Sequence, residues 1–152
     1  LLECLAHQLR YVMGEHTDCI VLRDELQALR EYFVIMKVRY EGRIRLSIQV
    51  SDEDAQLYIP KLLLQPVVEN AIRHGLREKN GEGTVAIRVE RKEDYLEIVV
   101  MDDGVGMEEE QVRIMQETLD NPEIGKTDAN GRLSVGMKNV YDRIKLNCGK
   151  ES

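Results

Sequence analysis

Apolar residues recur at helical spacing through the first forty positions. The intervals are three and four residues, first at Leu2, Leu5, Leu9 and Val12, and then at Leu22, Leu26, Leu29, Phe33, Met36 and Tyr40. This spacing predicts two amphipathic helices that are separated near residues 14–18. Two interpretations stay open: the helices pack on the domain that follows, or they are the end of a dimerisation bundle.

The middle of the chain alternates apolar and polar residues, as half-buried strands do. Residues 44–50 predict one such strand, and residues 57–59 predict a short edge strand that ends at Pro60. Two further strands are predicted over 81–91 and 95–101. The segment that joins these last two is short enough for an antiparallel hairpin.

A helix is predicted over residues 60–75, with Pro60 near its first turn and Gly75 at its C-terminal cap. Pro66 would then lie inside the helix. Because proline has no backbone N–H, we expect it to kink or divide the helix there.

Two more helices are predicted towards the C-terminus, over 108–120 and 134–147, with a loop over 121–132 between them. The expected buried side of the last helix includes Val135, Val140 and Ile144. Antiparallel strands on one side and helices on the other predict an α/β fold, a two-layer sandwich with a mixed, largely antiparallel sheet.

The composition bounds the class of protein. The 152 residues fit one ordinary domain, and the net charge of −7 argues against a nucleic-acid surface. The cysteines, Cys4, Cys19 and Cys148, are scattered, which fits free thiols in a reducing compartment. Apolar runs in the sequence fall well short of the about 18 residues of a membrane span.

The first candidate chemistry is Asp102-Asp103-Gly104-Val105-Gly106, directly after the predicted strand over 95–101. Glycine allows a backbone to approach a flat ligand closely. A carboxylate held in a cleft there can accept a hydrogen bond from an exocyclic amine such as that of adenine.

The second candidate is the helix around Asn70. At 100° per residue, one face holds Pro66, Asn70, Arg73, His74 and Arg77, and the opposite, core face holds Leu64, Val67, Val68, Ala71 and Ile72. An amide oxygen can ligate Mg²⁺, and a guanidinium can neutralise phosphate. An ordinary solvated face is the alternative.

The third candidate is the segment 131–143, in which Gly131 and Ser134 open a predicted helix behind a loop. The free N–H groups of a helix N-terminus suit phosphate. A plain helix cap at Ser134 is the alternative.

Taken together, these segments resemble the GHKL ATPase superfamily, which includes DNA gyrase, MutL and histidine kinases. LQPVVENAIRHG at 64–75 resembles its N box, DDGVGM at 102–107 its first glycine box, and SVGMKNV at 134–140 its second. The N box, the residues from Leu22 to Val50 and VGMKNVYDRIKL are closest to the LytS/YesM-type sensor histidine kinases. The resemblance covers nearly the whole chain.

The resemblance implies the Bergerat ATP-binding fold over residues 41–152, with a lid over about 107–133 and residues 1–40 as the end of a dimerisation bundle. Asp102 would accept a hydrogen bond from the adenine amine. Gly104 and Gly106 would shape the adenine wall, and Met107 would contact ATP beside them.

On the phosphate side, the resemblance implies that Asn70 holds Mg²⁺ and has a catalytic role. Arg73 would lie where many relatives place a phosphate-binding lysine, with His74 beside it. Glu69 is a further catalytic candidate, although it points about 100° away from Asn70. The phosphates would be capped by Ser134, Val135, Gly136, Met137 and Asn139.

Three residues depart from the pattern of the superfamily. Ser134 replaces a glycine, which reduces backbone freedom in the second glycine box. Met137 replaces a leucine. Pro66 lies where gyrase-like relatives carry a catalytic glutamate, so we expect weak intrinsic ATP hydrolysis.

The resemblance implies the ATP-binding catalytic domain of a sensor histidine kinase, with ATP and Mg²⁺ as cofactors. The phosphoryl acceptor would be a histidine upstream of Leu1, and a response regulator would receive the phosphoryl group. We expect a homodimer through upstream helices, a membrane anchor outside this chain and a cytoplasmic location. Two alternatives remain, namely a stand-alone serine kinase of the anti-sigma type and a nucleotide-sensing scaffold without transfer activity.

Overall fold

The computed structural model describes residues 1–13, 19–76 and 82–120, together with residues 140 and 144. The predicted break at 14–18, the predicted loop at 121–132 and nearly all of the predicted last helix lie outside the described residues.

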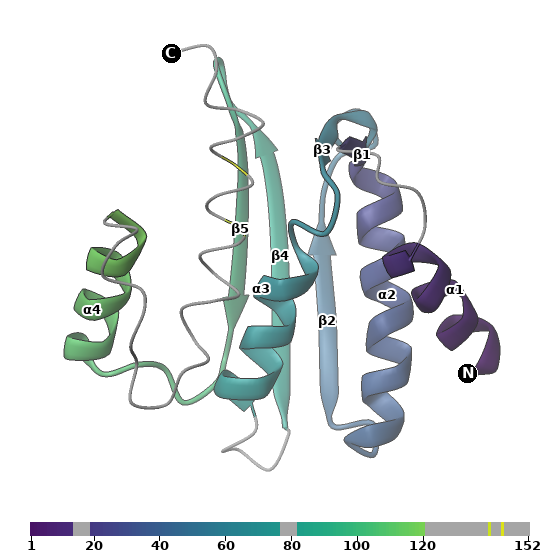
Figure 1. The fold of residues 1–152 in the computed structure, drawn as a ribbon, viewed down its shortest axis with the longest axis horizontal. Coiled ribbons are helices and arrows are strands. Elements are labelled where there is room, and N and C mark those ends of the chain that lie inside the picture. The colour runs from purple at the N-terminus through teal and green to yellow at the C-terminus, as the bar shows by residue number, and fades with distance from the viewer. Residues whose placement is uncertain (14–18, 77–81, 121–139, 141–143, 145–152) are drawn as a thin grey trace.

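The central sheet contains β2 (Ile44–Gln49), β4 (Gly83–Arg91) and β5 (Leu96–Asp102), in the order β2-β4-β5 (Figure 1). β2 pairs in parallel with β4, and β4 pairs antiparallel with β5. The sheet is therefore mixed and the predicted hairpin is confirmed, as is the α/β fold class. In this register Asp102, the last residue of β5, is opposite Val85 of the central strand.

Three predicted helices are confirmed: α1 (Leu2–Met13), α2 (Leu22–Arg39) and α4 (Glu109–Asp120). A second, two-stranded sheet pairs β3 (Tyr58–Pro60) with β1 (Cys19–Val21) in antiparallel fashion. The sequence reading predicted the edge strand β3 but missed β1, whose three residues are too few to show alternation.

The helix predicted over 60–75 begins later than expected. Pro60 ends β3, and α3 runs over Gln65–Asn70 with Pro66 in its first turn. The prediction that Pro66 kinks the helix is therefore wrong. The N–H of a residue in the first turn has no partner within the helix. Proline, which has no N–H, therefore costs no helical hydrogen bond at this position. A π-helical segment, η2 (Ala71–Leu76), continues α3.

One hydrophobic core joins α2 and α3 to the sheet. Leu22, Leu26 and Phe33 of α2 are at most 2% exposed. They share this core with Ile44, Ile59, Val68, Ile72, Leu76, Val85 and Ile87. Figure 1 shows α1 on the outer side of α2. Along α1, Leu2, Leu5 and Leu9 are exposed.

Two predictions about the last helix fall on described residues. Val140 is 8% exposed and belongs to the core, which confirms its predicted burial. Ile144 is 43% exposed, so its predicted burial is wrong. The division of the chain near residue 41 stays a prediction.

Candidate functional site

A cavity of about 1260 Å³ lies beside α3 and the end of β5. That volume is somewhat above the about 300–1,000 Å³ that is typical of small-molecule sites. The described part of its wall comes from α3, η2, β5 and α4, and from the loop between the last two. The lining residues are Val67, Asn70, Ala71, His74, Gly75, Val100, Asp102, Val105, Gly106, Met107, Glu108, Glu109, Glu110, Gln111 and Met115.

The N-box helix contributes Asn70 and His74 to the cavity wall, as the sequence predicted for that face. Arg73 is exposed and is not part of the wall, and its Nε donates to Nε2 of His74 at 3.1 Å. Val67 and Ala71, predicted on the core face, are half-buried and pack against the hydrophobic core, and both also line the cavity. The π-helical winding after Asn70 changes the angular step per residue, so a count at 100° does not place Arg73 correctly.

Glu69 lies outside the described cavity wall and is exposed. Its Oε1 accepts a hydrogen bond from Nε2 of Gln65 at 2.9 Å. Burial, followed by the nearby Glu69 carboxylate, raises the pKa of Tyr32 on α2 to about 12. Glu69 is therefore near Tyr32 of α2 and is not part of the described cavity wall.

The two aspartates that follow one another at the end of β5 have different environments. Asp102 lines the cavity, and its Oδ1 accepts the N–H of Gly104 at 2.9 Å. Asp103 is held by β4 instead: its Oδ1 accepts the N–H of Thr84 at 2.8 Å, and its own N–H donates to the carbonyl of Thr84 at 3.2 Å. Only Asp102 of the two can therefore offer its carboxylate to a ligand in the cavity.

Gly75 and Gly104 bring the N box and the first glycine box into backbone contact. A Cβ at Gly75 would lie 2.3 Å from Oδ1 of Asp102, and a Cβ at Gly104 would lie 2.3 Å from the carbonyl oxygen of Gly75. The N–H of Val105 donates to that same carbonyl at 3.0 Å. Gly75 thus allows the close approach of the Asp102 carboxylate, a role that the sequence reading missed when it assigned Gly75 as a helix end.

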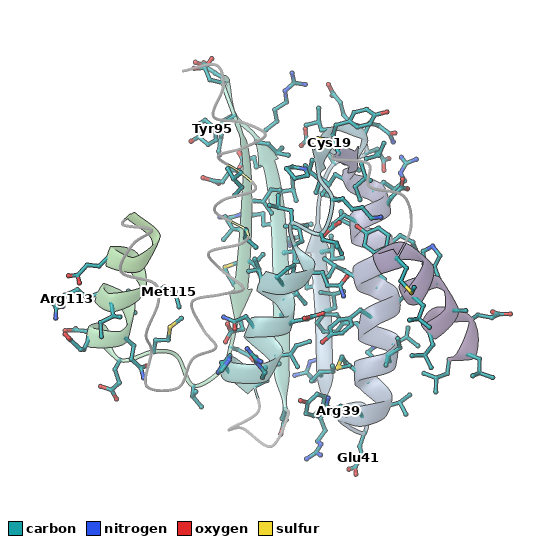
Figure 2. The ribbon with its side chains drawn as sticks, in the orientation of Figure 1. Cys19, Arg39, Glu41, Tyr95, Arg113 and Met115 are labelled. Atoms are coloured by element: carbon teal, nitrogen blue, oxygen red, sulfur yellow. The ribbon has the colours of Figure 1, made fainter. Side chains whose placement is uncertain are left out.

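The loop after β5 and helix α4 supply the outer wall. Gly106 has a φ of +73°, a conformation that suits glycine. Figure 2 shows Met115 on the side of α4 that faces the rest of the domain and Arg113 pointing away from it. Met107 lines the cavity, whereas Gly104 does not belong to the described lining. The remaining predicted contacts are outside the described residues: Ser134, Val135, Gly136, Met137 and Asn139.

The described lining combines an apolar surface with acidic groups. Val100, Val105 and Met115 offer contacts for a flat apolar ring, and Asp102 offers an acceptor at the edge of this surface. Three further carboxylates come from Glu108, Glu109 and Glu110, whereas His74 is the one side chain of the described lining that can become a cation. Against the described lining, a bound cation would reduce the repulsion between a polyphosphate and these carboxylates.

The helix that carries Asn70, the strand-end aspartate and the glycine-linked cavity define the class: an α/β nucleotide-binding domain of the Bergerat type. Residues 59–151 match the sequence profile of the histidine kinase-, DNA gyrase B- and HSP90-like ATPase family. The chain belongs to this family. Residues 1–44 match the histidine kinase profile.

Individual relatives are similar to the chain over nearly its whole length. Sensor protein kinase HptS of Staphylococcus aureus strains USA300 and NCTC 8325 / PS 47 is 26% identical over 148 residues, which is 97% of this chain and 27% of the relative. The chain thus spans about a quarter of these proteins. A histidine kinase domain from the Erythrobacter litoralis EL346 blue-light activated histidine kinase has the same fold, with a TM-score of 0.53 and 18% identity over 94% of this chain and 69% of that one.

The structure adds one observation about the membrane. Over the described ranges, which end at residue 120 apart from residues 140 and 144, we find no helix with the length and apolarity that a membrane crossing requires.

Proposed function

We propose that this domain binds ATP with Mg²⁺ and supplies the γ-phosphoryl group in a sensor histidine kinase. The observation that carries the proposal is the single cavity wall shared by Asn70, His74 and Asp102. These side chains come from two separate sequence motifs, and the fold places them around one space.

The described residues fit this ligand. The Asp102 carboxylate would accept a hydrogen bond from the adenine amine, and the apolar wall around Val100 and Met107 would contact the ring. The amide oxygen of Asn70 would hold Mg²⁺, which keeps several waters and binds through few protein ligands. When bound, the ion would neutralise charge on the phosphates during transfer.

The acidic lining predicts that this binding depends on Mg²⁺. Glu108, Glu109 and Glu110 would repel a bare triphosphate, whereas a magnesium complex carries less negative charge. The roles proposed for Arg73 and for the second glycine box, Ser134 to Asn139, are to balance and cap the phosphates. The catalytic role proposed for Glu69 would require it to act from outside the described wall.

In the whole protein, we propose that the acceptor is a histidine outside this chain and that the phosphoryl group passes to a response regulator. We also propose dimerisation through helices upstream of Leu1 and membrane anchoring through other parts of the protein, with this domain in the cytoplasm. The match of residues 1–44 to the histidine kinase profile supports these proposals over a stand-alone serine kinase of the anti-sigma type. A scaffold without transfer activity is distinguished by mass spectrometry of candidate partners after incubation with ATP.

The binding proposal is tested by calorimetric titration of a non-hydrolysable ATP analogue with and without Mg²⁺. Asp102→Asn should weaken binding at least about tenfold, because an uncharged amide presents a donor as well as an acceptor to the adenine edge. Asp103→Asn is the matched control: it removes the same charge one residue away, and we expect it to leave affinity within about twofold. Equal losses in the two variants would contradict the adenine role of Asp102.

A further inference from the structure

A carboxylate is buried at the junction of three helices, away from the cavity. Glu25 of α2 is 1% exposed and is the one charged residue in the buried part of the described chain. A buried charge is unfavourable unless hydrogen bonds satisfy it. The hydrogen-bond partners of the Glu25 carboxylate therefore indicate its structural role.

The partners of Glu25 are backbone groups at the start of α3. Its Oε1 accepts the N–H of Leu64 at 3.0 Å and that of Gln65 at 3.4 Å, and its Oε2 accepts the N–H of Leu62 at 3.0 Å. Leu62 has a φ of +58°, a strained conformation for leucine. The carboxylate thus caps α3 from another helix and holds the bent segment that leads into it.

The same carboxylate has a partner on α1. The hydroxyl of Tyr11 donates to Oε2 of Glu25. Burial and this hydrogen bond raise the pKa of Tyr11 above its ordinary value, so the hydroxyl keeps its proton. Nζ of Lys61, next to the capped segment, lies 5.1 Å from the centre of the Tyr11 ring. Contacts from α1 and α3 therefore meet at one buried group.

We propose that Glu25 is a positioning residue for the nucleotide site, and that Tyr11 makes this positioning respond to the placement of α1. The carboxylate fixes the start of α3 at Gln65, and the same helix ends at Asn70 on the cavity wall. Asp102 lies on β5, which is held by its ladder with β4, and its contact with the N box is at Gly75, beyond Asn70 and ten residues after the capped start of α3. A disturbance at Glu25 should thus affect the Asn70 side of the site and spare the Asp102 side. This inference rests on the proposed ATP and Mg²⁺ binding.

The test is the ratio of the dissociation constants measured without and with Mg²⁺ for a non-hydrolysable ATP analogue. Glu25→Gln should lower this ratio about tenfold, which corresponds to about 1.4 kcal/mol, because its NH₂ group would face backbone donors that the carboxylate now satisfies. Affinity without Mg²⁺ should stay within about twofold. A general loss of structure would change both constants together.

Two variants complete the design. Tyr11→Phe removes one hydroxyl and should lower the ratio about threefold, and it carries the test if Glu25→Gln does not fold. Glu31→Gln is the matched control, because Glu31 is also on α2 and binds His7 of α1, but its other hydrogen bond goes to Gln27 of its own helix. We expect its ratio to equal that of the wild type.

The outcomes separate the two proposals. If the wild-type chain does not bind the nucleotide with Mg²⁺, the proposed function is wrong. If the wild type binds, and Glu25→Gln and Tyr11→Phe both have the wild-type ratio of dissociation constants, the proposed function is unaffected. Glu25 then does not position the site. A ratio that falls equally in Glu31→Gln would also overturn the inference.

Discussion

At the scale of single residues, the site depends on one position without a side chain. The Cα of Gly75 leaves the space in which the Asp102 carboxylate lies, and its carbonyl oxygen accepts the N–H of Val105. The contact joins two motifs that are far apart in the sequence. Any side chain at residue 75 must displace the group that we propose to recognise adenine.

We therefore predict that Gly75→Ala weakens binding of the ATP analogue more than about tenfold and lowers the free energy of unfolding by about 1–3 kcal/mol. Gly42→Ala is the control. Gly42 has a φ of +78° and open space where a Cβ would lie, so alanine there should cost about 1–2 kcal/mol of stability through strain alone. Calorimetry and urea unfolding measure both quantities. Normal affinity in Gly75→Ala would contradict the close-approach role.

The sequence predicted the members of the site that lie in short contiguous motifs. A strand end and a helix face present their side chains in known directions, which makes Asp102 and Asn70 predictable from the sequence. The separation of Arg73 from Asn70 could not be predicted, because it depends on π-helical winding that apolar periodicity does not show. Most of the α4 side of the wall was also missed, since a loop decides where that helix lies.

At the scale of elements, the start of α3 shows how a distant residue overrides a local signal. The sequence around Pro60 and Pro66 allows a helix to begin at either proline. The choice is made by Glu25, about forty positions earlier, which caps the backbone at Leu64 and Gln65. Rules for helix starts consider only neighbouring residues and do not include such a contact. The sequence therefore predicts a helix start that is too early.

This placement predicts the effect of Pro66→Ala. In the first turn, proline costs no helical hydrogen bond and restricts the unfolded chain, so its removal should lower the free energy of unfolding by about 0.4–1 kcal/mol. A proline in the helix interior would instead cost about 3 kcal/mol, and alanine would then be stabilising. Urea unfolding of the wild type and of Pro66→Ala measures the sign of the change in the free energy of unfolding. A gain in stability of more than about 1 kcal/mol would contradict the observed helix start.

At the scale of the whole molecule, two helices with the same sequence period have different surroundings. Leu26 of α2 is 1% exposed, whereas Leu9 of α1 is 61% exposed. Periodicity predicts that a helix has an apolar face but not what covers that face. Because Leu26 and Phe33 belong to the core that α2 shares with the sheet, polar substitutions there should unfold the domain.

The contrast gives a matched pair of leucine substitutions. Leu26→Ala should lower the free energy of unfolding by about 2–5 kcal/mol, because it leaves a cavity in the core that α2, α3 and the sheet share. Leu9→Ala should change it by no more than about 0.5 kcal/mol, since this side chain already contacts water. Both values come from urea unfolding at several protein concentrations. A large loss in Leu9→Ala that grows with protein concentration would mean that a second copy covers α1 in solution, because a dimer interface stabilises by mass action. A large loss that is independent of concentration would contradict the exposed position of α1.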